Sequence, residues 1–384
     1  MTDMKNLFDQ IDALYEEYLQ IWREVCSIES QTCDKAGVDA VGDYFVALAK
    51  RHGWRVTRLA QECAGDVIDI TMNADSKLPP ICFSGHMDTV HERGSFGYPA
   101  VTEDSEKIYG PGVTDCKGGL VVGLLAMDAM ERCGFTKRPV KLLLQSEEEV
   151  ASAQSGGRSI EQICEWAKDA VGFLNLEMHT AGGAVIVRKG GINFTFTVRG
   201  TRAHAANCAI AGAGAIAEAA HKIVELEKLK DNDGITCSCG VISGGTAANT
   251  VPDFCEFKAN VRYATQEQFE WVCDYVQKVA DTVHVKGCTC TVTPAIGHPA
   301  MEYAERNLDF LETMNDIWEA NGMPRLALGR RNGASDAACV SAAGIPCVDS
   351  VGVEGGELHA RGEFAIKASL KSAAKRVAVV ACLI

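Results

Sequence analysis

The chain has 384 residues, of which 47% are hydrophobic and 23% are charged, and its formal net charge is −14. This length is enough for about two globular domains with a large core. The acidic excess argues against nucleic acid or an anionic membrane surface as the main partner. The apolar stretches are too short for a membrane span, and the N-terminus has no basic flank before an apolar run, so no signal peptide is expected.

Seventeen cysteines occur at scattered positions, with no Cys-x-x-Cys pair. A secreted disulfide framework would be short and even-numbered, so this pattern predicts a reducing, cytoplasmic location. Two Cys-x-Cys pairs, Cys237/Cys239 and Cys288/Cys290, raise the alternative of a metal site. Alternation along a strand puts both members of a pair on one face, and we interpret them as core residues.

The first half of the chain alternates strand-like and helix-like segments. Apolar residues recur at helical spacing from Leu7 to Val25, which predicts an amphipathic opening helix. Segment 118–133 is apolar nearly all round and predicts a buried helix. Strands are predicted at 54–60, 67–72, 79–85, 138–145 and 170–176, the first two paired with each other. This interleaving predicts an α/β fold, with a mixed, mostly parallel sheet sandwiched by helices.

From about Gly190 the pattern changes to polar–apolar alternation, which is typical of half-exposed strands. The predicted order in 190–299 is β-α-β-β-α-β, which indicates a ferredoxin-like unit with one open sheet face. After residue 300 the α/β pattern returns, with a helix, a strand and a closing helix at 334–344, 345–351 and 367–384. We therefore predict a discontinuous catalytic domain, residues 1–189 and 300–384, with an inserted lid domain, 190–299.

Acid or imidazole groups follow the predicted strands at four places: His86 with Asp88, Asp115 before the buried helix, the triplet 147–149, and Glu177. In open α/β sheets, sites form outside the carboxyl ends of the strands. Singly, each segment has an ordinary explanation, such as a hydrogen-bonded His or a solvated acidic turn. Together, the carboxylates would raise each other's pKa unless cations neutralised them. The set predicts two divalent metals that share a carboxylate and activate water.

The same residues resemble a known family. The segments His86-x-Asp88, Gly-x-x-Asp115-x-Lys-Gly-Gly, the Glu-Glu before Val-Ala-Ser, Glu177 and the late His359 resemble the co-catalytic zinc hydrolases. That family includes aminoacylase, acetylornithine deacetylase, succinyl-diaminopimelate desuccinylase and peptidase T, and the bacterial glutamate carboxypeptidases are the most similar branch. The resemblance runs from about residue 80 to 363, and separations of 29 and 34 residues between the first three motifs fit it.

The resemblance implies a role for each position. It implies that Asp115 bridges two zinc ions per chain, for which cobalt or manganese could substitute. His86 and Glu177 would complete one site, and Glu149 and His359 the other. The zinc-peptidase type of sheet fold and a cis peptide bond after Asp115 are implied as well.

The resemblance also implies the catalytic groups. Glu148 would be the general base, and Asp88 would hydrogen-bond the far nitrogen of His86 and fix its tautomer. The family has Asp-Glu-Glu where this chain has three glutamates, and the following Val-Ala-Ser places Glu147 outside the site. An offset of one residue is the alternative. Cys116 adjoins the bridging Asp, and we interpret it as a spectator, because the resemblance supplies five N/O ligands without it.

The lid carries further motifs. His204 ends a Gly-x-x-Ala-His segment, which in the family reaches across a dimer interface to stabilise an oxyanion. Asn249 and Arg262 match positions that bind the substrate's carboxylate, and an arginine fork suits that ligand. The ordinary alternatives are a loop histidine at 204 and a surface salt bridge at Arg262. The resemblance at His204 implies a homodimer formed through the lid, and the alternative is a monomer whose lid serves only as a cover.

The loop before His359 is glycine-rich. Gly355 and Gly356 resemble the residues that shape the family's substrate pocket, where backbone can approach a ligand closely. Glu357 stands where the glutamate carboxypeptidases usually have another glycine, which leaves the exact substrate open. Arg330 and Arg331 are additional carboxylate-binding candidates, with a structural role as the alternative.

The function predicted from these motifs is metal-dependent hydrolysis of a peptide or N-acyl amino acid that carries a free carboxylate. We favour a carboxypeptidase, with an N-acyl amino acid deacylase, such as an acetylornithine deacetylase or a desuccinylase, as the alternative. A catalytically inactive relative would lack a ligand or the base, and all six are present. A thiol hydrolase is disfavoured because no Cys/His pair can be argued.

Overall fold

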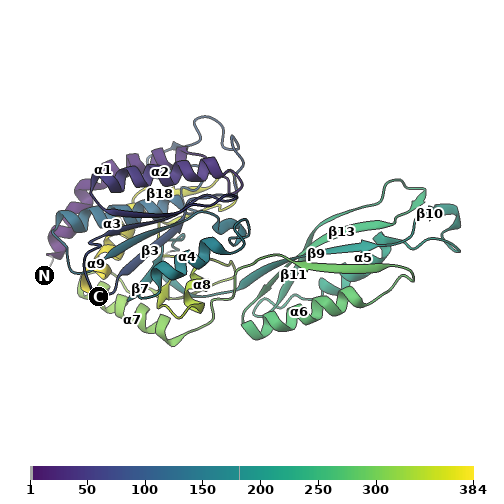
Figure 1. The fold of residues 1–384 in the computed structure, drawn as a ribbon. Coiled ribbons are helices and arrows are strands. Elements are labelled where there is room, and N and C mark those ends of the chain that lie inside the picture. The colour runs from purple at the N-terminus through teal and green to yellow at the C-terminus, as the bar shows by residue number, and fades with distance from the viewer. Residues whose placement is uncertain (1–2, 181) are drawn as a thin grey trace. The chain divides into compact units, whose positions relative to one another are not determined.

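The computed structural model describes residues 3–180 and 182–384, and they form two compact units (Figure 1). The large unit comprises Met1–Val187, Tyr303–Arg330 and Ser335–Ile384, and the small unit comprises Arg188–Glu302 and Arg331–Ala334. Among the described helices, none is both long enough and apolar enough to cross a membrane.

A six-stranded sheet forms the centre of the large unit. Its order is β1-β2-β6-β3-β7-β16. The first two pairings are antiparallel and the other three are parallel, so the prediction of a mixed, mostly parallel sheet is confirmed. The strands are β1 (Arg55–Leu59), β2 (Val67–Met72), β3 (Ile81–His86), β6 (Val140–Gln145), β7 (Gly172–Asn175) and β16 (Cys347–Val348).

Helices cover both faces of this sheet, as two neighbouring residues of β6 show. Leu142 packs beneath Gly123 of α3 (Lys117–Arg132). Lys141 instead donates from Nζ to the carbonyl oxygen of Trp166 in α4 (Arg158–Ala167), at 2.8 Å. Successive side chains of a strand point to opposite faces, so α3 and α4 lie on opposite faces. The other α-helices among the described residues of the large unit are α1 (Met4–Ser27), α2 (Lys35–Arg51), α7 (Glu305–Ala320), α8 (Ala337–Ala342) and α9 (Ser369–Leu383).

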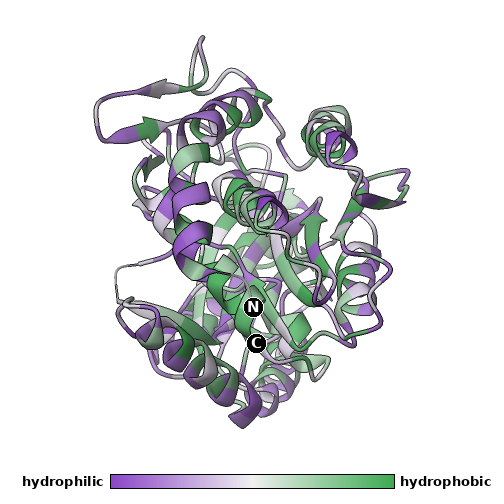
Figure 2. Ribbon diagram, turned by 90° about the vertical axis from the view of Figure 1, so that its left-hand side faces the viewer, coloured by the Kyte–Doolittle hydropathy of each residue, from purple (hydrophilic) through white to green (hydrophobic). Residues whose placement is uncertain are grey.

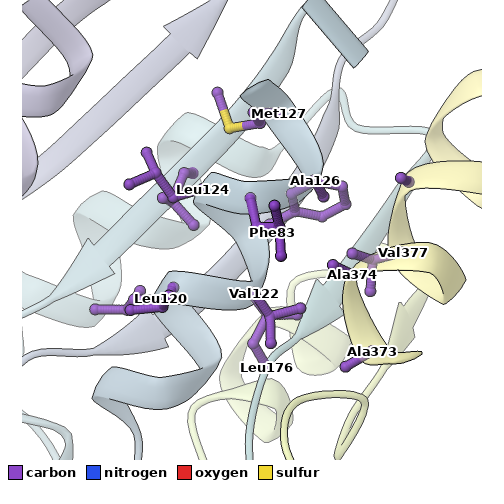
Figure 3. Packing of buried hydrophobic residues seen from close by; sticks show 14 of the residues in the cluster. Phe83, Leu120, Val122, Leu124, Ala126, Met127, Leu176, Ala373, Ala374 and Val377 are labelled. Carbon is purple, nitrogen blue, oxygen red and sulfur yellow. The ribbon is translucent and has the colours of Figure 1, made fainter. Parts of the chain in front are cut away.

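The helix α3 is apolar nearly all round because it is enclosed. It packs on β3 and β6 on one side and against α1 and α9 on the others. Figure 3 shows Val122 of α3 between Leu176 and the α9 residues Ala374 and Val377. Burying one such aliphatic side chain contributes about 1.5–3 kcal/mol. Figure 2 shows the complementary pattern, with hydrophobic strands inside and outer helices that carry hydrophilic faces.

A second, four-stranded sheet of the large unit was not predicted. Its order is β17-β18-β5-β4, and all of its pairings are antiparallel. The strands are β17 (Gly355–Gly356), β18 (Phe364–Ile366), β5 (Lys107–Tyr109) and β4 (Thr102–Glu103). Strands of two or three residues are too short to show a period of two. This sheet ties the segment before Asp115 to the segments on either side of His359.

The small unit has the predicted β-α-β-β-α-β order. Its antiparallel sheet runs β11-β13-β9-β14, and α5 and α6 both pack on it. The elements are β9 (Gly190–Arg199), α5 (Ala215–Leu226), β11 (Thr236–Gly244), β13 (Phe254–Tyr263), α6 (Gln266–Asp281) and β14 (Thr289–Pro294). Phe196 and Phe257 stack in its core with ring centroids 4.5 Å apart. In the small unit β10 (Ala203–His204) also pairs with β12 (Thr250–Val251). A further pair, β8 (Gly183–Arg188) with β15 (Ala327–Arg331), belongs to the large unit except for the last residue of each strand.

Candidate dinuclear metal centre

Three neighbouring parallel strands bring most of the candidate ligands to one edge of the large sheet. His86 is the last residue of β3. Glu148 and Glu149 open the 3₁₀ turn that follows β6, and Glu177 comes two residues after β7. Strands β6, β3 and β7 lie side by side in parallel, so their carboxyl ends meet at the same edge, where α/β sites form.

Asp115 and His359 reach this edge from other elements. Asp115 lies two residues before α3, next to its N-cap Cys116, and the Asp115–Cys116 peptide bond is cis, as the resemblance implied. A Cβ at Gly119 would lie 2.0 Å from the carbonyl oxygen of Leu176, so the glycine lets the start of α3 approach the end of β7. His359 lies in the loop between β17 and β18.

The donor atoms form two groups that share Asp115. His86 Nε2 lies 3.0 Å from Asp115 Oδ1 and 3.5 Å from Glu177 Oε1. His359 Nε2 lies 3.3 Å from Asp115 Oδ2 and 3.2 Å from Glu149 Oε2. Each carboxylate oxygen of Asp115 therefore faces a different group, which is the arrangement that a bridging ligand needs.

Burial and charge at this edge favour cations. Asp115, Glu148 and Glu177 are all buried, and burial raises the pKa of Glu148 well above its usual range. Contacts with Asp115 and Glu149 raise the pKa of His359 to about 10. Two imidazoles cannot neutralise this many buried carboxylates, whereas divalent ions would. Imidazole nitrogens and carboxylate oxygens are ligands that Zn²⁺ accepts, so the residues fit two such ions.

The hydrogen bond between Asp88 and His86 differs from the one predicted from the sequence. The closest acceptor for His86 Nδ1 is the backbone carbonyl of Asp88, at 2.9 Å, and its carboxylate Oδ1 is farther, at 3.3 Å. A proton on Nδ1 leaves the Nε2 lone pair for a metal, so the tautomer is still fixed by this residue. The carboxylate accepts the N–H groups of Glu148 and Glu149, at 3.1 and 3.3 Å, and the hydroxyl of Thr32.

Two neighbours of the candidate ligands are engaged elsewhere. The buried carboxylate of Glu147 accepts the N–H groups of Gln154 and Ser155, at 2.9 and 3.2 Å, so it holds the following loop. Cys116 donates from Sγ to the carbonyl oxygen of Leu176 at 3.2 Å, and burial raises the pKa of its thiol. A thiol kept protonated is a poor metal ligand.

In the small unit, His204 and Asn249 occupy neighbouring positions. The backbone carbonyl of Asn249 accepts the N–H of Ala205 at 2.9 Å, and β10 pairs with β12. His204 Nδ1 accepts the N–H of Ala206 at 3.1 Å, so in the neutral imidazole the proton lies on Nε2. The exposed His204 side chain therefore presents a hydrogen-bond donor.

Arg262 lies on β13 of the same unit. Its Nε donates to Asn260 Oδ1 at 3.0 Å. A Cβ at Gly191 would lie 2.5 Å from its guanidinium NH1, so that glycine makes room for the fork. No carboxylate among the described residues is paired with Arg262 in the structure. The alternative role of Arg262, a surface salt bridge, is therefore not found among the described residues.

The remaining candidates lie in loops and short strands. A Cβ at Gly355 would lie 2.2 Å from the carbonyl oxygen of Phe364, so close strand packing accounts for this glycine. Gly356 pairs with Phe364 in the same ladder, and the exposed Glu357 has a φ of 55°. Arg330 and Arg331 end β15.

Two residues that were not predicted from the sequence make hydrogen bonds to residues of the site. Thr32 binds Asp88, and Glu363 binds the backbone around Asp115. The backbone partners of the Glu363 carboxylate are 248 to 251 positions away in the sequence, and its imidazole partner His91 is 272 positions away. No local pattern in one sequence could have identified Glu363.

The fold and the donors together define a class of protein. An α/β sheet that gathers imidazole and carboxylate donors at its strand ends, with one aspartate shared by two groups, is typical of a metal-dependent hydrolase. The chain belongs to peptidase family M20/M25/M40, whose model matches residues 82–384. It is therefore a hydrolase of peptide or amide bonds, and the predicted family is confirmed.

Individual relatives are distant. The chain is 26% identical over 343 residues to carboxypeptidase G2 from Pseudomonas sp. (strain RS-16), covering 88% of this chain and 81% of that protein. It is 24% identical over 279 residues to a probable succinyl-diaminopimelate desuccinylase from Staphylococcus aureus (strain MRSA252), covering 63% and 67%. The solved structure of a dinuclear metal-binding M20 peptidase from Bacillus subtilis has a TM-score of 0.69 and 15% identity over 97% of this chain and 98% of that one.

Proposed function

We propose that this chain is a dinuclear zinc carboxypeptidase that cleaves the amide bond of a small peptide with a free C-terminal carboxylate. The observation that carries the proposal is the pair of donor groups around Asp115, with one carboxylate oxygen facing each group. The similarity to carboxypeptidase G2 over 88% of the chain supports the substrate class. The thiols, all free in the structure, support the cytoplasm as its location.

The ions would be held by His86, Asp115 and Glu177 on one side and by Glu149, Asp115 and His359 on the other. Bound there, they would polarise the scissile carbonyl and lower the pKa of the attacking water.

Glu148 is the proposed proton carrier. Its carboxylate takes a proton from the water that adds to the carbonyl carbon, and returns that proton to the amine nitrogen as the C–N bond breaks. Burial raises the pKa of Glu148, and a general base that accepts the proton from water and later returns it typically contributes about 10²–10⁴-fold to the rate. The Asp88 carboxylate fixes the backbone of Glu148 and thereby its side chain's starting point.

Arg262 and Asn249 are the proposed anchors for the substrate's carboxylate. Arg262→Lys should raise KM about 10- to 100-fold and change kcat less, because a lysine cannot make the bidentate contact. A matched substrate whose C-terminus is an amide serves as the control, since it offers no carboxylate to lose. Equal KM values for the acid in wild type and variant would remove Arg262 from the site.

We also propose a homodimer in which His204 serves the active site of the neighbouring subunit. Its Nε2–H makes no hydrogen bond to the residues that the structure describes and could donate to an oxyanion, and such a donor is commonly worth about 3–4 kcal/mol. The sheet of the small unit leaves β11 as an edge strand, and Val241 and Ile242 on it are exposed. Edge strands are usually paired or covered, and a two-fold dimer would do so.

A complementation experiment tests the role in trans. Inactive Glu148→Gln is mixed with inactive His204→Ala, and the subunits are allowed to exchange. A mixed dimer then has one site with an intact Glu148 and an intact His204 from the partner, so activity should return. No recovery after exchange has been demonstrated directly would exclude the role in trans.

The alternative function is deacylation of an N-acyl amino acid, which the similarity to the desuccinylase favours. A panel of C-terminal glutamyl peptides, acetyl amino acids and succinyl amino acids separates the two. The carboxypeptidase proposal predicts the highest kcat/KM for the peptides. Preference for the acyl amino acids would replace it with the alternative, and no turnover of any compound by the zinc-loaded chain would contradict both.

A further inference from the structure

Glu363, which is not one of the proposed metal ligands, has a buried carboxylate that hydrogen-bonds the backbone of the turn leading to Asp115. Glu363 is fully buried, and its Oε1 accepts the N–H groups of Thr114 and Asp115, at 2.9 and 3.1 Å. Its Oε2 accepts the N–H of Gly112 at 3.2 Å and lies 2.8 Å from His91 Nε2. Three backbone donors and one imidazole thus meet on a single carboxylate.

The backbone beside Glu363 reinforces the same turn. Its own carbonyl oxygen accepts the N–H of Gly110 at 3.2 Å. The next residue, Phe364, accepts the hydroxyl of Thr114 at 2.6 Å through its carbonyl oxygen. The whole segment from Gly110 to Asp115 is therefore tied to two consecutive residues of the chain's last third.

We propose that Glu363 is a positioning residue that holds Asp115 in place and thereby sets how tightly the two metal ions are bound. This inference rests on the proposed metal centre. Asp115 must present one oxygen to each donor group, so a small rotation of its backbone would disturb both groups at once. Hydrogen bonds to an ionised carboxylate are stronger than neutral ones, which suits a residue that must prevent that rotation.

The proposed role of Glu363 depends on the two acceptor oxygens of its carboxylate rather than on the volume of the side chain. In Glu363→Gln the amide NH₂ replaces one oxygen, so either the Gly112 N–H or the N–H groups of Thr114 and Asp115 would face another donor. Glu363→Asp keeps the charge but withdraws the carboxylate by one methylene group. Both variants should loosen the turn, and the Asp variant keeps a buried anion for His91 to contact.

The control is Glu218, a buried glutamate of the small unit that also accepts hydrogen bonds from backbone N–H groups. Glu218 accepts the N–H groups of His284 and Val285, at 2.9 and 2.6 Å, and pairs with Lys222 at 2.9 Å. Glu218→Gln also puts an amide against backbone donors, but none of these partners is a candidate metal ligand. It should lower thermal stability and leave metal affinity unchanged.

The experiment is a zinc titration of the metal-free proteins against a competing chelator, at a temperature where circular dichroism shows each variant folded. Glu363→Gln and Glu363→Asp should bind zinc about 10- to 100-fold more weakly than wild type. In the metal-free state, hydrogen exchange at the amides of Thr114 and Asp115 should be faster in both variants. Variants that bind two ions as tightly as wild type, or exchange these amides no faster, would overturn the role of Glu363.

The wild-type titration keeps this inference separate from the proposed function. A wild type that binds fewer than two ions would contradict the metal centre itself. A wild type that binds two ions, alongside unaffected Glu363 variants, would contradict the positioning role alone.

Discussion

Glu148→Gln should reduce turnover by about 10²–10⁴-fold while the chain keeps both metal ions. The amide has nearly the volume of the carboxylate, but it cannot accept a proton from water. The side chain is not one of the five proposed ligands, and its backbone N–H stays bonded to Asp88. Metal content and kcat measured on the same sample check both halves of this expectation.

The neighbouring Glu147 supplies the matched control. Its carboxylate holds the N–H groups of Gln154 and Ser155, so Glu147→Gln should lower thermal stability and reduce kcat far less than Glu148→Gln. The opposite order, with Glu147→Gln nearly inactive and Glu148→Gln active, would show that the register of the triplet is off by one.

Asp115→Asn should release at least one metal ion and lower kcat/KM by more than about 10³-fold. An amide offers only one oxygen and no charge, so it cannot serve both donor groups. The loss corresponds to several kcal/mol of transition-state stabilisation that the metals supply. Metal analysis after dialysis measures the release directly.

Asp69→Asn is the control for this substitution. Asp69 is also buried in the large unit, where it accepts the hydroxyl of Thr71 at 2.6 Å and pairs with Lys141 at 3.2 Å. This variant should lose stability but keep its metals. Retention of both ions by Asp115→Asn would mean that Asp115 is not the bridge.

Much of the fold follows from patterns within single elements. The continuous apolar run of α3 predicted a buried helix, and the alternation of β9 predicted a half-exposed strand, and both are found. Helix α2 also carries the signal, since its buried residues Val38, Val41 and Phe45 are spaced three and four apart, but it was not predicted. The strands of the second sheet carry no such signal, because two or three residues cannot show a period.

The site could be anticipated to the extent that its residues follow strands. His86, the Glu148–Glu149 pair and Glu177 stand at the ends of adjacent parallel strands, where topology alone predicts that side chains meet. The contacts that orient these side chains do not follow from the strand order. Thr32 and Glu363 act through hydrogen bonds to residues far away in the sequence, and only the folded chain reveals them.

The proposed dinuclear centre is tested most directly by a zinc titration of the metal-free chain in which bound zinc and peptide turnover are measured together. Two zinc ions per chain are expected at saturation, turnover should appear only as the sites fill, and a chelator that removes the metal should abolish turnover completely. Saturation at a single ion, or undiminished turnover by the metal-free chain, would contradict the proposed centre.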